Sequence, residues 1–177
     1  QRWKRYFSNE LSTQEWEDSF TQLYQLTKNT QLLILQYKIS HFILPANEFL
    51  FKCGIKETDL CTWCEEEIET LPHILVECEV VKRFWELLKR WICQKLNTPI
   101  NITSKEIVFG INRHDQTHIN MIYMLAKKYI YTQKCQNQFI ALENFTAYLL
   151  EEMRLNQLVK LVDNGQDSSQ AIWQTPL

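Results

Sequence analysis

Three cysteines and one histidine follow one another at spacings typical of a metal site. Cys61 and Cys64 are separated by two residues, His73 follows after eight residues, and Cys78 follows after four more. Two cysteines at the first spacing can turn their thiolates toward one point. On a short helix His73 and Cys78 lie about one and a half turns apart, near enough to share that point if the helix end frays. Three sulfurs and one imidazole are a ligand set that structural zinc prefers, so the pattern predicts one zinc ion.

A tetrahedral zinc with these four ligands has no position left for water, which disfavours a catalytic metal. The alternative is a coincidence of four unrelated buried residues, and the ordered spacing argues against it. Between Lys56 and Glu79 the sequence holds eight acids and one base. Three thiolates and Zn²⁺ add a charge of about −1. A segment this acidic is a poor cradle for phosphate, so we interpret the zinc first as a structural staple.

The segments PANEFLFKCGI and LCTWCEEEIETLPHILVECEVVKRFW resemble the zinc-binding segment that follows the reverse transcriptase in polyproteins of non-LTR (long interspersed, LINE-type) retrotransposons. The stretch from Pro45 to Gly54, the glutamates before Thr70 and the pair Phe84-Trp85 carry the resemblance. The later segment NMIYMLAKKYIY resembles the helix that follows in that family. The resemblance implies an accessory domain of a target-primed reverse transcription machine, with the polymerase domain of the parent polyprotein as a partner.

Composition favours a helical protein. The 177 residues include only three glycines and four prolines, which indicates long helices rather than a turn-rich sheet. We therefore predict a mainly α fold, a small helical domain organised around one structural Cys3His zinc knuckle. The expected parts are an N-terminal helical segment (1–54), the knuckle with the helix after it (55–96), a C-terminal helical pair (97–165) and a disordered tail (166–177).

Hydrophobic periodicity and capping residues predict where the helices lie. The expected spans are 12 to about 27, 32–44, 47–51, a short helix carrying His73 after Thr70 and Pro72, 80–96, 104–109, 115–136 and 139–162. The span 32–44 is apolar nearly all round, so we expect it to be the most buried element. Residues 1–7 are expected to be a solvated or linker segment of a longer protein. Contact with a nucleic-acid strand is the alternative for these residues.

Basic residues concentrate after the knuckle although the net charge of the chain is −2. On the predicted helix 80–96 they fall into two adjacent rows. Three further lysines on the predicted helix 115–136 form a possible second strip. Lysine and arginine at such positions can neutralise phosphates of RNA or DNA, and a solvated face is the alternative. The candidate nucleic-acid residues are Lys82, Arg83, Lys89, Arg90, Lys127, Lys128 and Lys134.

The remaining cysteines and histidines are expected to have structural roles. Cys53, Cys93 and Cys135 should be reduced, small buried apolar groups outside the metal shell. We expect His41 to be a packing histidine. His114 and His118 are four apart, but a surface pair is favoured over a second metal site.

The sequence suggests an intracellular protein of the cytoplasm and nucleus. Neither a signal peptide nor an apolar run of about 18 residues is found, so no membrane association is expected. The odd set of three thiols left after the metal ligands fits a reducing compartment better than disulfides do.

No catalytic motif is recognised. Reverse transcription needs paired aspartates that hold two metal ions, and the five aspartates here are isolated from one another. We therefore expect no enzyme and no small-molecule substrate. Two functional hypotheses remain. The first is an accessory module that binds template RNA or target DNA, and the second is a structural or protein-interaction domain that packs on the polymerase or on a host factor.

Overall fold

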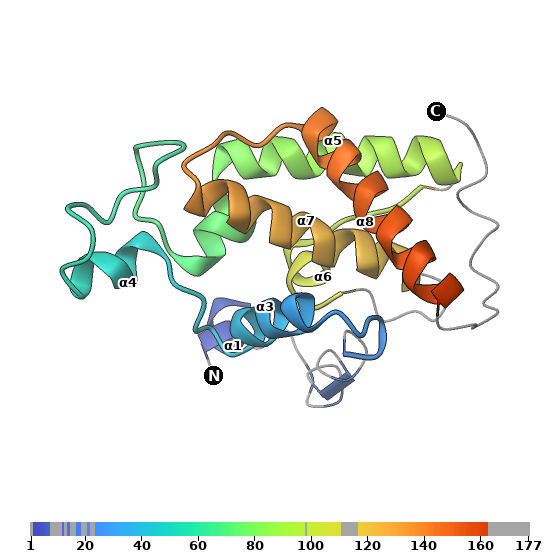
Figure 1. Ribbon diagram of the computed structural model, residues 1–177. Coiled ribbons are helices and arrows are strands. Elements are labelled where there is room, and N and C mark those ends of the chain that lie inside the picture. Colours follow the sequence, from blue (N-terminus) through green and yellow to red (C-terminus); the bar gives the residue numbers. More distant parts are fainter. Residues whose placement is uncertain are drawn as a thin grey trace. The chain divides into compact units, whose positions relative to one another are not determined.

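A computed structural model describes residues 2–7, 24–97, 99–110 and 117–162, with isolated positions between 12 and 21. The described residues are mainly helical, as predicted, with one isolated β-bridge. The chain divides into two compact units, residues 1–142 and 143–177. The elements in order are α1 (Arg2–Tyr6), α3 (Thr30–Ser40), α4 (Asn47–Lys52), the π-helix η1 (His73–Glu77), α5 (Glu79–Leu96), α6 (Ser104–Phe109), α7 (Thr117–Cys135) and α8 (Leu142–Val162) (Figure 1). No helix among the described residues is long and apolar enough to cross a membrane.

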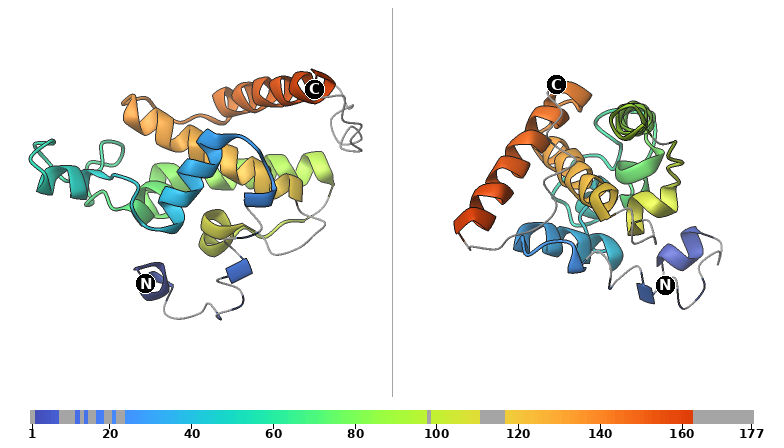
Figure 2. Two further views of the ribbon diagram at one scale, coloured as in Figure 1. Left: turned by 60° about the horizontal axis from the view of Figure 1, so that its bottom comes forward. Right: turned by 90° about the vertical axis from the view of Figure 1, so that its right-hand side faces the viewer.

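The core of the first unit forms where η1 meets α5, α6 and α7. The aromatic side chains of α5 contact those of α7, which runs beside it (Figures 1 and 2). Phe84 lies parallel to Tyr129 at 6.0 Å between ring centroids, and Trp85 meets Tyr123 edge-on at 5.8 Å. Such pairs add about 0.5–1.5 kcal/mol each beyond the burial of their area. The buried residues of α5 lie on one face of the helix, and Trp85 is among them.

The N-terminal residues belong to the core, so their predicted role as a solvated or linker segment is wrong. Trp3 is 1% exposed and donates its indole N–H to the carbonyl oxygen of Ile39, at 2.7 Å. Its ring also contacts the rings of Phe42 and Phe109. Burial of a tryptophan is favourable when its polar N–H has a partner, and here the end of α3 supplies it. The helix predicted from residue 12 to about 27 lies largely outside the described residues.

Helix α3 ends earlier than the proline at 45 predicts. Asn29 caps its start by accepting from the backbone N–H groups of Gln31 and Leu32. At its end the backbone N–H of Phe42 reaches the carbonyl of Ile39. Phe42 has a φ of 59°, a conformation that glycine adopts at less cost, and its ring packs against Trp3. Tertiary packing of the aromatic ring therefore ends the helix at Ser40.

Helix α3 is also less buried than predicted. Ile34 is 51% exposed and Tyr37 is 48% exposed, whereas Leu32 and Ile39 are buried. The element is thus an ordinary surface helix with one inner face. Helix α6 is capped by Thr103, which forms a complete capping box with Glu106.

The second unit contains nearly all of α8. Phe145 and Leu149, one turn apart, are its buried residues among those described, and Phe145 contacts Tyr148. The predicted helix 139–162 is confirmed except for its first three residues. The boundary at residue 142 places α7 with the zinc-binding part of the chain rather than with α8.

Lys127 is buried, which corrects its predicted place on a nucleic-acid surface. It is 1% exposed, and its Nζ donates to Gln36 Oε1 at 2.6 Å and to the carbonyl oxygen of Val108 at 3.0 Å. Burial lowers the pKa of Lys127 to about 7. The two N–H groups of a neutral amine match the two acceptors, so at pH values well above 7 Lys127 ties α7 to α3 and α6 as an uncharged group.

Lys127→Met should change how stability depends on pH. In the unfolded chain the lysine stays protonated until about pH 10.4, so between about pH 7 and 9 the unfolded state of the wild type binds one more proton than the folded state. The free energy of unfolding of the wild type, minus that of Lys127→Met, should therefore rise with pH by up to about 1.4 kcal/mol per unit. Urea unfolding at several pH values measures this. The exposed substitution Lys38→Met is the control, and parallel curves for wild type and Lys127→Met would contradict the assignment.

Candidate metal centre

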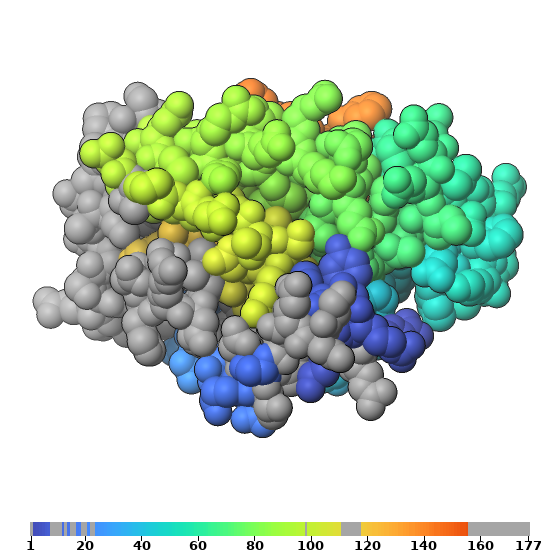
Figure 3. All heavy atoms as spheres, turned by 180° about the vertical axis from the view of Figure 1, so that it is seen from behind, coloured from blue at the N-terminus to red at the C-terminus, as the bar shows by residue number. Residues whose placement is uncertain are grey.

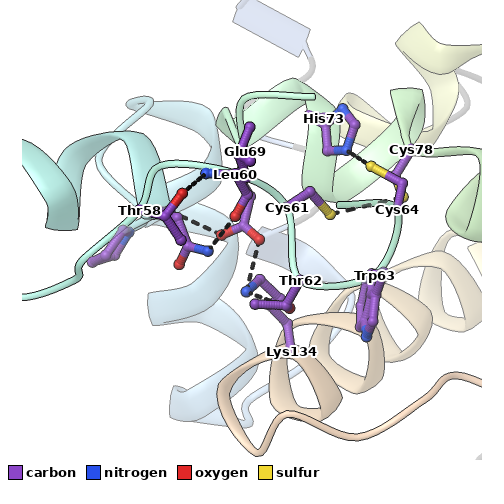
Figure 4. Close-up of polar contacts among 12 residues, drawn as sticks. Thr58, Leu60, Cys61, Thr62, Trp63, Cys64, Glu69, His73, Cys78 and Lys134 are labelled. Atoms are coloured by element: carbon purple, nitrogen blue, oxygen red, sulfur yellow. Dashed lines mark hydrogen bonds and ion pairs between the residues drawn. The ribbon is translucent and has the colours of Figure 1, made fainter. Parts of the chain in front are cut away.

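The four predicted ligands converge. Their ligand atoms, three sulfurs and one imidazole nitrogen, all lie within 4.8 Å of one another. The Sγ atoms of Cys61 and Cys78 are 3.9 Å apart, and Cys64 Sγ lies 3.4 Å from His73 Nε2 (Figure 4). A tetrahedral zinc has edges of about 3.8 Å between two sulfurs and about 3.6 Å between sulfur and nitrogen. The spacing and the donor types therefore fit one zinc ion, with His73 binding through Nε2.

A π-turn brings His73 and Cys78 together. The backbone N–H of Cys78 donates to the carbonyl oxygen of His73 at 3.0 Å, a bond between residues five apart. In an α-helix two such residues point about 140° apart around the axis, whereas a π-turn separates them by roughly one turn. Thr70 caps the start of this helix, because its hydroxyl accepts from the N–H of His73 at 3.1 Å. The sequence predicts the helix and its cap, but it does not predict the π-turn.

The first two cysteines lie on a short hairpin. An isolated antiparallel bridge pairs Leu60 with Ile68, and the N–H of Cys61 donates to the carbonyl oxygen of Glu67 at 2.8 Å. The turn closes where the N–H of Glu65 donates to the carbonyl of Cys61. Glu65 has a φ of 58°, so the residue after Cys64 occupies the left-handed conformation. This turn aims both thiols at the same side.

Hydrogen bonds within the cluster shift the pKa values of the ligands in opposite directions. The contact with Cys78 and burial raise the pKa of the Cys61 thiol to about 12. The same contact, aided by the backbone N–H groups of Val80 and Val81, lowers the pKa of Cys78. Contact with Cys61 raises the pKa of His73 to about 9. The ligands compete for protons, and a zinc ion that binds them displaces those protons.

Glu67 lies next to the imidazole nitrogen on the side away from the cysteines. Its Oε2 is 3.3 Å from His73 Nδ1, but the geometry is not that of a hydrogen bond. A carboxylate that accepts from the second nitrogen of a zinc-bound histidine fixes the ring and makes it more basic.

A buried ion pair fixes the hairpin to α7. Glu69 is 1% exposed, and its Oε2 lies 2.7 Å from the Nζ of Lys134 (Figure 4). The same ammonium donates to the hydroxyl of Thr62, between the two cysteines, at 3.0 Å. Loss of one partner would leave a buried charge, which costs about 3–5 kcal/mol. The pair was not predicted. Glu69 is the last of four glutamates in the run from Glu65 to Glu69, and nothing in the sequence distinguishes it from its exposed neighbours or indicates which base it meets.

Two further contacts hold the hairpin. Trp63 donates its indole N–H to the carbonyl oxygen of Gln138, just after α7, at 3.0 Å. Asn47 donates its side-chain amide to the carbonyl oxygen of Leu60 at 2.8 Å, and its backbone N–H reaches Glu69 Oε1. Asn47 therefore ties α4 to the hairpin, and α4 begins without a side-chain cap. Gly54, with a φ of 70°, follows the last turn of α4 and ends the helix.

The candidate nucleic-acid residues fall into two groups. Lys82, Arg83 and Arg90 are exposed on α5 and Lys89 is half-buried there. Lys82 pairs with Glu79 at 2.6 Å, an acid not expected in the basic band. Lys127 and Lys134 are buried, so the prediction of a second strip is wrong for both. Lys128 is half-buried.

The other cysteines and histidines lie outside the cluster. Cys53 and Cys135 are exposed and Cys93 is half-buried, so their predicted role as buried apolar groups is wrong for the first two. All three are free thiols in the structure. His41 is exposed and packs on the ring of Tyr37, with 4.0 Å between centroids. His114 lies outside the described residues.

Comparison with known proteins supports the zinc assignment. Residues 2–85 match a family model described as zinc-binding in reverse transcriptase. The match covers a little under half of the chain and contains all four cluster residues. A search of curated proteins found no match. The chain thus carries a segment similar to the zinc-binding region associated with reverse transcriptases, and the matched model describes metal binding rather than catalysis.

Cys64→Ser should release the metal. The four ligands are scattered in the unfolded chain, so zinc binding contributes to folding free energy, on the order of 10 kcal/mol. The wild type should contain one zinc per chain by elemental analysis and lose thermal stability in chelator, and Cys64→Ser should resemble the chelated protein. Cys53→Ser, which alters an exposed thiol outside the cluster, should keep both its zinc and its melting temperature. A wild type without zinc, or one whose melting temperature is the same in chelator, would contradict the site.

Proposed function

We propose that the chain is a non-catalytic zinc-binding accessory domain of a non-LTR reverse transcriptase, acting inside the cell in the cytoplasm and nucleus. In this role it holds template RNA or target DNA beside the polymerase during target-primed reverse transcription. The family match supports the association with reverse transcriptase. The resemblance in sequence supports the LINE-type assignment.

The basic band of α5, defined as Lys82, Arg83, Lys89 and Arg90, is the proposed contact for nucleic acid. Helix α5 carries five bases and two acids in a chain with a net charge of −2. Its inner face is buried against the core, so the bases lie on the remaining surface. Two adjacent rows of bases make a band that can follow a phosphate backbone.

The zinc ligand Cys78 connects the metal to this helix. It immediately precedes Glu79, the first residue of α5, and the N–H groups of Val80 and Val81 donate to its sulfur. Zinc binding at Cys78 therefore fixes the end from which the band projects. The single observation that carries the proposal is this direct connection between the metal centre and an exposed basic helix.

The acidic hairpin favours the alternative function. In that function the domain packs on the polymerase or on a host factor and does not contact nucleic acid. Glu65, Glu66 and Glu67 are all exposed beside the metal and would repel phosphate. Under the first proposal these glutamates confine nucleic acid to α5.

Replacing the four bases of the band with glutamine should weaken binding of RNA and DNA alike. Each lost phosphate contact removes about 0.7–0.9 units from the slope of log affinity against log salt, so the slope should flatten by roughly two to four units. Filter binding with single-stranded RNA and with single-stranded and duplex DNA over a salt series measures this.

A matched control replaces four exposed lysines outside the band, at positions 28, 38, 52 and 56, with glutamine. It changes the net charge equally and should leave affinity and slope nearly unchanged. Equal binding by the band variant and the wild type would favour the domain that makes no nucleic-acid contact. Equal loss in both variants would show a general charge effect instead of a defined surface.

A further inference from the structure

Helix α4 and the zinc hairpin expose several large apolar side chains at one end of the first unit. Figures 1 and 2 show these segments projecting beyond α5 and α7, and in Figure 3 they form the cyan and turquoise end of the molecule. We name this the α4–hairpin surface and define its apolar part by five residues. These are Phe49 (58% exposed), Phe51 (46%), Ile55 (68%), Leu60 (37%) and Ile68 (50%).

Three of these residues come from the facing sides of α4 and the hairpin. Leu60 and Ile68 are directly paired in the β-bridge, so their side chains lie on the same side of the hairpin. Asn47 reaches the carbonyl of Leu60, and Phe51 follows Asn47 by one helical turn on the same face of α4. Phe51 therefore lies on the side of α4 that faces the hairpin. An apolar group of this kind with a polar rim is typical of an interaction site.

The surface is held rigidly. The backbone N–H groups of Asn47 and Glu48 bond to Glu69, which is itself paired with buried Lys134. The metal ligands Cys61 and Cys64 lie within the hairpin. These contacts fix the backbone of both α4 and the hairpin. A partner that binds here therefore does not lose binding free energy to ordering that backbone.

The charge around the apolar group is acidic. Glu57, Glu65, Glu66 and Glu67 are exposed and Asp59 is half-buried, whereas the local bases are Lys52 and Lys56. Lys52 is engaged by Glu48 on its own helix. Neighbouring residues of a strand point to opposite faces, so Glu67, which lies 3.3 Å from His73 Nδ1, belongs to the other face of the hairpin. The exposed acids near the apolar pair are therefore Glu57, Glu65 and Glu66. The rim therefore repels phosphate and favours a partner with positive charge.

We propose that the α4–hairpin surface docks a basic amphipathic segment of a partner protein, with apolar side chains flanked by lysine or arginine. The apolar residues of the partner cover Phe51, Leu60 and Ile68, and its bases meet the acidic rim. This goes beyond the proposed nucleic-acid role of α5 and does not depend on it, since the two surfaces carry opposite charge.

A direct test uses a fluorescent helical peptide of leucine and lysine, with leucines at positions i, i+3, i+4 and i+7. Fluorescence anisotropy should show saturable binding to the zinc-loaded full chain, weakened by salt. A peptide of the same pattern with glutamate in place of lysine should not bind. The triple variant Phe51→Ser, Leu60→Ser, Ile68→Ser should bind the basic peptide at least about tenfold more weakly.

Two further variants keep the test decisive. The first is a control that removes equally exposed apolar residues from around α3, with the substitutions Ile34→Ser, Tyr37→Ser and Ile43→Ser. This control should bind the peptide as tightly as the wild type does. The second is the double variant Glu65→Gln, Glu66→Gln, which leaves the apolar group in place. It should bind the basic peptide more weakly, and salt should affect its binding less. Zinc content and melting temperature identify any variant that has not folded.

Three outcomes would overturn the docking site. The first is that the leucine–lysine peptide shows no saturable binding to the wild type. The second is that the folded triple variant binds the peptide as tightly as the wild type, and the third is that the α3 control loses as much affinity as the triple variant. If the wild type self-associates with rising concentration and the triple variant does not, the surface binds a second copy of this chain instead. RNA binding measured on the same proteins separates this test from the first one, since the triple variant should retain it.

Discussion

The convergence of two segments on one metal-sized site is the constraint on which the first unit depends. Cys61 and Cys64 come from a hairpin with almost no regular structure, whereas His73 and Cys78 come from a buried helix. The hairpin has little apolar content directed inward, and an isolated β-bridge stabilises it only weakly. Zinc can supply the missing stabilisation, since ligand binding and folding of such a segment are coupled.

Two other kinds of interaction extend that constraint to the rest of the unit. The ion pair between Glu69 and Lys134 fixes the hairpin to α7, and the neutral amine of Lys127 joins α7 to α3 and α6. Both lysines are on the same helix, seven residues apart, so they lie on nearly the same face. Helix α7 thus acts as the scaffold against which the metal-binding segment and the N-terminal helices are positioned.

The sequence predicts the parts of the structure that depend on local chemistry. The ligand set, the cap at Thr70 and the amphipathic helix α5 each follow from spacing and residue type, and the structure has them. It does not predict interactions whose partner is far along the chain. Lys127 and Lys134 have the polarity of surface residues, and partners far along the chain make their burial possible: Gln36 and the Val108 carbonyl for Lys127, Thr62 and Glu69 for Lys134. The same holds for Trp3, whose partner Ile39 lies 36 residues away.

The resulting molecule separates its charges. The metal-binding hairpin and α4 carry more acids than bases around exposed apolar residues, whereas α5 carries a group of exposed bases. Cys78 lies at the junction, as a ligand of the proposed zinc and the residue before α5. A net charge of −2 therefore conceals two surfaces of opposite charge, one proposed to contact phosphate and one proposed to dock a basic protein segment.

X-ray absorption at the zinc K-edge of the purified protein tests the metal centre most directly, because it counts the ligand types around the ion. The structure predicts three sulfur ligands at about 2.3 Å and one nitrogen ligand at about 2.0–2.1 Å, with no oxygen in the shell. A shell with two sulfurs, or one containing a water or carboxylate oxygen, would contradict the closed Cys3His site.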